Sequence, residues 1–477
     1  RSEIERNAND DYNHFMHVRT RIPPSPTGED LHIGSVYTAL INYAVAKKNG
    51  GEFIIRIEDT DQARLVKGAE EKFLQTLKDY NLNYDEAPDK EGSVGPYRQS
   101  ERLDTYQRYA KGLIETGKAY YCICSKERLD KLRESQQKNK QVPRYDKHCL
   151  AKQEELKKKV ENGDKYVIRL NIEPNVEVKF NDLIHGDIII NSDNLDDQVL
   201  MKSDGFPTYH LAVVDDHFMK ISHVIRGEEW ISSTPKHVLL YEAFGWDKPI
   251  YAHVPLLRNP DKSKLSKRKN PVWASWYLQQ GFLPEAVLNY LSLMGWSHPK
   301  QKEIFDMDEF IKVFELKDMK PVGPAFDVVK LEWMNGMYIR NMDNNDLRDK
   351  IYEFYKEKYS KELIEKTIPL VRERIKKLSD YYPLSEFFFE EPKKHEVDLK
   401  KHKALIAKMH EALTDLKDWK ADKIGEVLQG LAEKEGLKNS EFFMIVRVVI
   451  TGKKISPPLN DSMELLGKEE CLKRLKV

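Results

Sequence analysis

The sequence predicts an α/β domain with a parallel sheet, followed by an all-α half. Up to about residue 260, short β-branched runs alternate with stretches of helical period. The first of these segments read strand, loop, helix, strand, which is a βαβ unit and places its two strands parallel in one sheet. Beyond about residue 275 the apolar residues recur almost only at helical spacing.

Five segments are predicted as strands: MHVRTRI (16–22), GEFIIRIED (51–59), KYVIRLNI (165–172), DIIIN (187–191) and ISHVIRGEE (221–229). The segment VYTALINYAVAKKNGG joins the first two. Its apolar residues fall at positions 36, 40, 41, 44 and 45, and two lysines and a Gly-Gly pair end it. The helical half is represented by PEAVLNYLSLMGW, DLRDKIYEFYKEKY, KELIEKTIPLVRERIKKLSDYY and DKIGEVLQGLAEKEGL.

Length and composition favour a soluble protein of several domains. A chain of 477 residues corresponds to roughly three domains. Hydrophobic residues make up 40% and charged residues 33%, and no apolar run approaches the roughly 20 residues of a membrane helix. The 78 basic and 78 acidic residues cancel, so a polyanionic partner would be bound by local patches rather than by the field of the whole chain.

The cysteine count and the start of the chain predict a cytoplasmic location. Four cysteines do not form a disulfide framework for a chain of this length. The first 15 residues have neither the apolar core of a secretion signal nor the Arg-rich, acid-poor composition of a transit peptide.

The turn PPSPTGEDLHIGS (23–35) joins the first predicted strand to the first helix. It therefore lies at the carboxyl edge of the sheet, where open α/β sheets bind ligands. Its prolines stiffen the exit from the strand, and Gly34 leaves the backbone at the helix N-terminus open to a phosphate. His32 would donate a hydrogen bond to an oxygen that gains negative charge.

The segment DKSKLSKRK (261–269) contains five cations in nine residues. Such a run is usually a solvated surface. Together with the histidine turn, however, a loop carrying Lys264 and Lys267 is able to close over a triphosphate and neutralise the charge that moves onto pyrophosphate.

These two motifs, HIGS (32–35) and KLSKR (264–268), resemble the signatures of class I aminoacyl-tRNA synthetases. Within that class, the chain is similar to bacterial-type glutamyl-tRNA synthetases in a series of ordered segments: RIPPSPTG, RIEDTDQAR, GPYRQSERLDTYQRYA, SDGFPTYHLA, VIRGEEW, LLRNPDKSKLSKRK and WMNGMYIR. The resemblance implies a Rossmann-type catalytic domain and a two-step reaction, in which ATP activates L-glutamate and the glutamyl group passes to the terminal adenosine of tRNA(Glu).

The chemistry of glutamate agrees with this resemblance. Two carboxylates and one ammonium group need two cationic forks and at least one carboxylate. Arg21, Arg226 and Glu58 each end a predicted strand, so their side chains are expected to converge at one sheet edge. The resemblance implies the amino-acid pocket Arg21, Ser25, Glu58, Tyr209 and Arg226, and the nucleotide residues His32, Gly34, Glu229, Trp230, Lys264 and Lys267, with Mg²⁺ accompanying ATP.

Three cysteines predict a zinc site. Cys122, Cys124 and Cys149 lie close in the sequence, and thiolates are good ligands for tetrahedral Zn²⁺. The fourth ligand is either Tyr145 or His148. The pattern of zinc-bearing relatives, C-x-C followed by Y-x-x-x-C, favours Tyr145, although imidazole is the commoner ligand chemically.

The resemblance also implies a domain order. The catalytic domain comprises residues 16–98 and 200–255, and an inserted acceptor-binding domain with the zinc site lies at 99–199. A stem-contact domain with the lysine loop follows at 256–330, and an α-helical anticodon-binding domain at 331–477. Arg374 is the candidate residue for rejecting tRNA(Gln), and the candidate phosphate contacts are Lys393, Lys394, Lys400, Lys401, Lys403 and Lys408. A monomer is expected.

Two positions depart from the family pattern. Three residues separate Gly28 from His32 where the family has two. After Ala212 the chain continues with VVDDH (213–217) and is one residue shorter there than the family pattern. Val213 is therefore not assigned a role in the pocket.

Other functions are considered beside glutamate ligation to tRNA(Glu). An enzyme that also charges tRNA(Gln) and a catalytically silent tRNA-binding paralogue are the alternatives. A truncated relative that modifies a tRNA base would lack the helical tail, and glutaminyl-tRNA synthetase has a β-barrel in its second half, so both are disfavoured.

Overall fold

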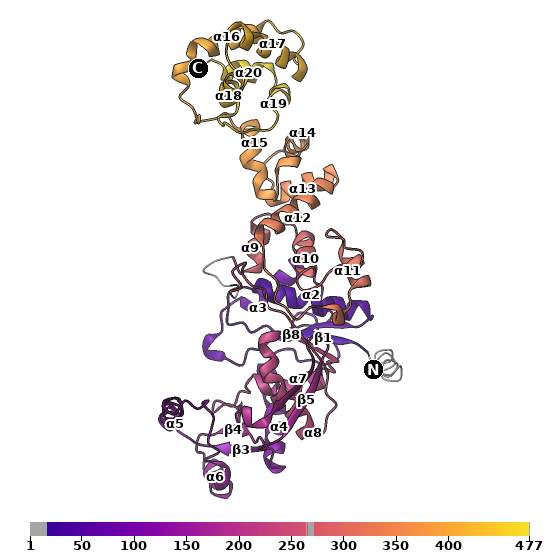
Figure 1. Cartoon of the computed structure of the whole chain (residues 1–477), viewed down its shortest axis with the longest axis vertical. Coiled ribbons are helices and arrows are strands. Elements are labelled where there is room, and N and C mark those ends of the chain that lie inside the picture. Colours follow the sequence, from indigo (N-terminus) through magenta and orange to yellow (C-terminus); the bar gives the residue numbers. More distant parts are fainter. Residues whose placement is uncertain (1–16, 264, 266–270, 477) are drawn as a thin grey trace. The chain divides into compact units, whose positions relative to one another are not determined.

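A computed structural model of the chain describes residues 17–263, 265 and 271–476 (Figure 1). These residues form two compact units. The first comprises the described residues before 277 together with Leu288–Asp327, and the second comprises Tyr277–Val287 and the described residues from Val328 on. No helix of the described residues is long and apolar enough to cross a membrane.

The predicted βαβ unit is present at the start of the first unit. β1 (Arg19–Ile22) and β2 (Glu52–Ile55) pair in parallel, and α2 (Ile33–Lys48) connects them. The apolar residues of α2 are buried against the sheet, and Lys47 and Lys48 lie in its last turn. A Cβ atom at Gly51 would come within 1.9 Å of the Val18 carbonyl oxygen, so this approach to β1 requires glycine.

The second half of the parallel sheet follows about 170 residues later in the chain. β8 (His223–Gly227) and β9 (Ile250–Val254) pair in parallel, in a sheet of order β6-β5-β9-β8. The amide of Ser222, just before β8, donates to the Arg19 carbonyl at 3.0 Å, which places β8 beside β1. β5 (Glu177–Asp182) and β6 (Gly186–Asn191) form an antiparallel hairpin that extends this sheet beyond β9.

A separate antiparallel sheet lies within the predicted insertion. It has the order β3-β4-β7, with β3 (Ala119–Cys122), β4 (Val167–Leu170) and β7 (Val199–Met201). α5 (Lys126–Lys138) has no buried residue and α6 (Gln153–Glu161) has one, so both are surface helices, as the Lys/Glu-rich composition predicts.

The remaining helices of the first unit cover the sheets: α3 (Ala69–Asp79), α4 (Leu103–Glu115), α7 (Val213–Phe218), α8 (Thr234–Phe244) and α11 (Met307–Val313). Two further helices, α9 (Ala274–Gln279) and α10 (Pro284–Ser292), have residues in both units.

The second unit is helical throughout its described residues. Its remaining helices are α12 (Val328–Asn341), α13 (Asn344–Phe354), α14 (Lys361–Val371), α15 (Tyr381–Phe389), α16 (Lys403–Thr414), α17 (Ala421–Lys434), α18 (Asn439–Thr451), α19 (Leu459–Leu466) and α20 (Lys468–Arg474). They pack around two separate hydrophobic cores, one centred on α13 and α14 and the other on α16 to α20. Cys471 is a free cysteine buried in the second core.

The helical run at 361–382 is broken in the structure. α14 ends at Val371, short 3-10 turns follow, and α15 begins at Tyr381. Pro383 lies in the first turn of α15, where its missing amide hydrogen removes no hydrogen bond of the helix. The continuous part of the second unit starts at Val328, close to the predicted boundary at residue 331.

Candidate active site

A cavity of about 740 Å³ lies in the first unit, where β1 and β8 end. All the predicted glutamate and nucleotide residues that the structure describes line it: Arg21, Ser25, His32, Gly34, Glu58, Tyr209, Arg226, Glu229 and Trp230. Lys264 and Lys267 lie outside the described residues. Leu265, between them in the sequence, also lines the cavity.

His32 caps the N-terminus of α2 at the wall of this cavity. Its Nδ1 atom accepts a hydrogen bond from the Gly34 amide at 3.0 Å, so the neutral ring carries its proton on Nε2. The imidazole can therefore donate from Nε2 at a helix N-terminus, where the helix dipole also favours an anion.

The lysine loop leaves from and returns to the same cavity. On its near side, the Asn259 amide donates to the Ser263 carbonyl at 2.8 Å, and Arg258 bonds Glu228 at 3.2 Å. On its far side, the Ile33 amide donates to the Val272 carbonyl at 2.7 Å, directly beside the histidine turn. Both ends of the loop are thus fixed next to the site at which a triphosphate would lie.

Arg21 extends from β1 into the cavity, and one of its three nitrogens has no hydrogen-bond partner among the described residues. Its Nε and Nη2 atoms donate to the two carboxylate oxygens of Asp216 at 3.0 and 3.1 Å. Its Nη1 atom is buried and has no hydrogen-bond partner among the described residues. A buried cationic donor without a partner suits a ligand carboxylate.

Arg226 is the second buried cation of the cavity. It donates to Tyr209 Oη at 2.5 Å, to Thr234 Oγ1 at 2.8 Å and to His253 Nε2 at 3.1 Å. Each of these contacts reduces the rotational freedom of the guanidinium group. Arg226 is therefore held in a fixed orientation before any ligand enters.

A carboxylate contacts Arg226 indirectly, through His253. Asp182, on β5, lies 2.6 Å from His253 Nδ1. Burial lowers the pKa of His253, although the bond to Asp182 acts in the opposite direction, so the ring is neutral near pH 7. The Nδ1 proton faces Asp182, which leaves Nε2 to accept from Arg226. Sequence analysis did not identify Asp182 or His253.

Glu58 is the predicted partner of the ammonium group, and it lines the cavity. Its Oε1 atom accepts from Arg56 Nη2 at 3.0 Å, and burial raises the pKa of its carboxyl although Arg56 opposes the shift. The cavity therefore contains the two arginines and the carboxylate that the two carboxylates and the ammonium group of glutamate require.

The predicted nucleotide residues include an aromatic wall of the cavity. The rings of Tyr209 and Trp230 lie 4.2 Å apart, and 37% of Trp230 is exposed. Tyr209 therefore links the two sides, because its hydroxyl contacts Arg226 and its ring contacts Trp230.

Comparison with known proteins identifies the family. The catalytic-domain model of the class I tRNA synthetases (E and Q) matches residues 17–333, and an anticodon binding domain model matches residues 344–477. The chain belongs to the class I tRNA synthetases of the E and Q group. The sequence-based assignment to this class and the fold class are thereby confirmed.

Similar proteins cover nearly the whole synthetase chain. The glutamate–tRNA ligase of Acidothermus cellulolyticus is 46% identical over 97% of this chain and 95% of its own. The glutamate–tRNA ligase of Clostridioides difficile is 43% identical over 96% and 98%. The crystal structure of a glutamate tRNA ligase from Elizabethkingia meningosepticum, in complex with its amino acid, superimposes with a TM-score of 0.85 at 39% identity, over 96% of this chain and 98% of that one.

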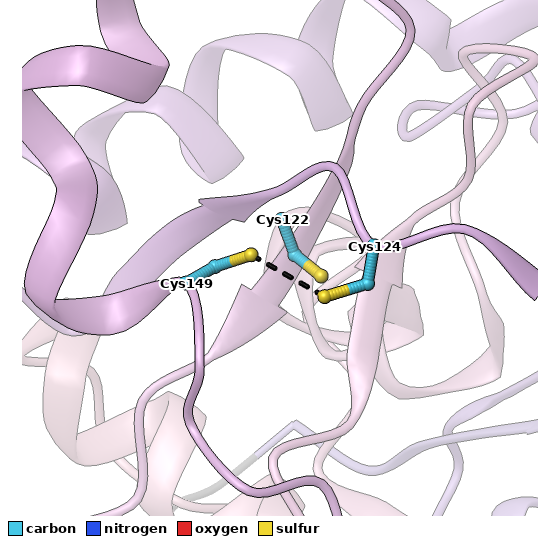
Figure 2. Close-up of side chains that lie close together, drawn as sticks. All are labelled: Cys122, Cys124 and Cys149. Atoms are coloured by element: carbon cyan, nitrogen blue, oxygen red, sulfur yellow. Dashed lines mark hydrogen bonds between the residues drawn. The ribbon is translucent and has the colours of Figure 1, made fainter. Parts of the chain in front are cut away.

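The three predicted zinc-binding thiols of the synthetase lie together (Figure 2). The Sγ atoms of Cys122, Cys124 and Cys149 are all within 4.8 Å of one another, and those of Cys124 and Cys149 are 3.5 Å apart. Sulfur ligands of a tetrahedral zinc ion lie about 3.8 Å from one another, so the donor set fits this metal. The cluster is the only such group of metal-binding side chains among the described residues.

The two candidates for the fourth ligand differ in position. Tyr145 Oη lies 3.4 Å from Cys122 Sγ and 3.2 Å from Cys124 Sγ. His148 is exposed, and its Nε2 atom lies 3.3 Å from Lys152 Nζ. The geometry therefore favours Tyr145. The guanidinium of Arg169 also covers the Tyr145 ring, at 4.1 Å from its centre.

Arg374 lies at the end of the 3-10 turn that follows α14. It is exposed, and its Nη1 atom donates to the Ser456 carbonyl at 2.8 Å. The neighbouring Ile455 is 72% exposed, so this part of the second unit combines a cation with an uncovered apolar side chain.

Two of the six candidate phosphate lysines are paired with acids. Lys408 Nζ lies 2.6 Å from Glu435, and Lys393 Nζ lies 3.7 Å from Glu390. An RNA phosphate would have to compete with these carboxylates, which weakens the case for both lysines.

Proposed function

We propose that the protein is a glutamate–tRNA ligase that uses ATP to attach L-glutamate to tRNA(Glu) for protein synthesis. The observation that carries this proposal is the single cavity in which Arg21, Arg226 and Glu58 meet, next to His32 at the start of α2. Its support from relatives is the 46% identity to a glutamate–tRNA ligase over nearly the entire chain.

Glutamate binds through its three charged groups. Arg21 and Arg226 each take a carboxylate, and Glu58 faces the ammonium group. Tyr209 and Ser25 complete the pocket. The buried Nη1 donor of Arg21 gains its missing acceptor when glutamate enters, and a charged hydrogen bond at a buried donor is strong.

The first step joins glutamate to AMP. An oxygen of the α-carboxylate attacks the α-phosphorus of ATP, which enters as its magnesium complex, and the bond to the bridging oxygen breaks to release pyrophosphate. His32 donates from Nε2 to the phosphates, the α2 N-terminus at Gly34 binds them, and Lys264 and Lys267 neutralise the leaving pyrophosphate. Glu229 and Trp230 hold the nucleoside.

The second step transfers the glutamyl group to tRNA. The 2′-hydroxyl of the terminal adenosine attacks the carbonyl carbon of the adenylate, and the bond to AMP breaks. Positioning contributes most of the acceleration in both steps, because no side chain acts as a nucleophile. As in related enzymes, we expect tRNA to bind before the adenylate forms.

Each domain of the chain has its own role. Residues 16–98 and 200–255 carry the catalytic site, and residues 99–199 bind the acceptor end. Residues 256–330 contact the stem, and residues 331–477 read the anticodon. The protein works in the cytoplasm as a monomer.

Zinc stabilises the acceptor-binding part. Cys122, Cys124, Cys149 and Tyr145 would hold it, and the bound ion would tie the loop before Cys149 to the end of β3. Arg169 lies against the Tyr145 ring and helps to orient it.

Aminoacylation of two tRNAs tests this function. The purified protein should charge tRNA(Glu) with radiolabelled glutamate and leave tRNA(Gln) uncharged, because Arg374 excludes it. Arg374→Gln should admit tRNA(Gln), whereas the exposed control Lys393→Gln should not change the preference. Charging of both tRNAs by the unmodified protein would show the non-discriminating alternative, and charging of neither would contradict the proposal.

A further inference from the structure

Two adjacent carboxylates, Asp215 and Asp216, are buried in the first turn of α7. They belong to the VVDDH segment, which departs from the family pattern. A buried carboxylate is costly unless cations or several donors surround it. The partners of each aspartate therefore indicate what it does.

Asp215 faces α4, away from the cavity. Its oxygens accept from Arg102 Nε at 2.7 Å, from Gln99 Nε2 at 2.8 Å and from Tyr106 Oη at 2.7 Å. These bonds fasten the first turn of α7 to α4 and to the 3-10 turn before it. Asp215 thus fixes the backbone on which Asp216 stands.

Asp216 faces β1 and the segment after β2. It holds two edges of the Arg21 guanidinium, and its Oδ1 atom also accepts from Arg56 Nη1 at 2.7 Å. Although burial alone would raise it, Arg21 and Arg56 lower the pKa of Asp216 to about 2. The carboxylate is therefore charged throughout the physiological range.

Arg56 extends the contact to Glu58. It is fully buried, and its Nη2 atom donates to Glu58 at 3.0 Å. An alternating chain of charges results, in the order Arg21, Asp216, Arg56, Glu58. Only its two ends, Arg21 and Glu58, line the cavity.

We propose that Asp216 and Arg56 are positioning residues that fix the distance and orientation between Arg21 and Glu58, the groups that bind a carboxylate and the ammonium of glutamate. This inference rests on the proposed function. Neither residue touches the substrate, so each acts through the end group that it holds.

The orientation of Arg21 explains why Asp216 matters for binding. Because Asp216 occupies Nε and Nη2, Nη1 is the buried nitrogen of Arg21 that has no partner among the described residues. A guanidinium released from Asp216 would rotate and offer its donors in several directions. The pocket would then lose the fixed geometry that selects one placement of the carboxylate.

Steady-state kinetics of Asp216→Asn test the proposal. We expect KM for glutamate to rise at least about tenfold, because the amide carries no charge and its NH2 group cannot accept from Arg21 Nη2 as Asp216 Oδ2 does. KM for ATP should stay within about threefold, since His32 and the nucleotide side are not held by Asp216. A merely structural residue would alter the active fraction and leave this ratio of KM values unchanged.

Arg56→Gln separates the two ends of the chain. Glutarate is the probe, because it has both carboxylates of glutamate and no ammonium group. Arg56→Gln should weaken glutamate binding at least about tenfold and inhibition by glutarate less than about threefold, since Glu58 acts on the ammonium only. Asp216→Asn should weaken both ligands.

The matched control is Glu86→Gln. Glu86 pairs with Arg19, which lies on β1 two residues before Arg21, in an ion pair that is also buried but does not line the cavity. The loss of this pair should lower the melting temperature and leave KM for glutamate unchanged.

The outcomes distinguish this inference from the proposed function. Glutamate-dependent activity of the unmodified protein establishes the function on its own, and its absence would overturn the function first. With activity present, equal shifts of both KM values, or equal effects of Arg56→Gln on glutamate and glutarate, would contradict the positioning role. Failure of both variants to fold would show that the pair is structural, which also overturns the proposal.

Discussion

Buried histidines link the stability of the first unit to pH. His210, His223, His237 and His253 are all buried, and burial lowers the pKa of each. The shift takes the pKa of His223 to about 4 and that of His210 to about 3. These rings are neutral in the folded protein at pH values at which the unfolded chain is protonated.

Acidification should therefore destabilise the first unit. Between pH 6.5 and about 4, His223 binds a proton in the unfolded chain but not in the folded protein. The free energy of unfolding therefore decreases as the pH falls through this range. A single histidine of this kind costs about 2 kcal/mol at pH 5. Melting temperatures at pH 7.5 and pH 5 should fall less for His223→Gln than for the unmodified protein.

The choice of variant isolates this residue from the active site. His223 bonds Ser222 and does not line the cavity, and the exposed His395→Gln is the control. Identical losses of stability on acidification in the unmodified protein and His223→Gln would show that His223 does not contribute.

Sequence analysis predicted residues that line the cavity, but not the buried residues that contact them. Arg21, Arg226 and Glu58 could be placed at one edge because each ends a strand and parallel strands share an edge. Their roles stay a prediction. Asp216 and Asp182 contact residues 195 and 71 positions away, and spacing carries no information about such contacts. For Asp216 the sequence did contain one signal, a pair of adjacent aspartates inside the apolar run HLAVVDDHFM.

At the scale of elements, short strands were the hardest to predict. The strands with clear β-branched runs were found, whereas β3, β5, β7 and β9 were not. β5 alternates exposed and buried residues in EVKFND, but the charged half of that pattern obscures it. Its Asp182 nevertheless supports the active site through His253, so a missed strand concealed a functional contact.

The loop that follows β3 offers a test of the zinc site. Purified protein should contain one zinc ion, and Tyr145→Phe should lower its affinity at least about tenfold in competition with a chelator. The variant retains the ring against Arg169 and removes only the oxygen that faces the thiols. His148→Ala is the matched control and should retain zinc.

Two results would contradict this account of the metal. Loss of zinc in His148→Ala but not in Tyr145→Phe would exchange the fourth ligand. Protein purified without chelators that contains no zinc would show that the three thiols are unmetallated.

At the scale of the whole molecule, the net charge of zero means that tRNA is bound by local surfaces. Helical period predicted an all-α stretch beyond about residue 275, but Leu288–Asp327 of that stretch belongs to the first unit, so period alone did not separate the two units. The points at which the helices of the second unit begin and end depend on single residues such as Pro383. The packing of these helices into two cores depends on contacts between helices, which periodicity does not specify.

The central claim is that one cavity brings glutamate and ATP together. Exchange of radiolabelled pyrophosphate into ATP measures this step directly, with glutamate or glutamine as the amino acid, and with or without tRNA(Glu). We predict exchange with glutamate in the presence of tRNA(Glu), and none with glutamine. Absence of exchange with glutamate under every condition, or exchange with glutamine alone, would contradict the account.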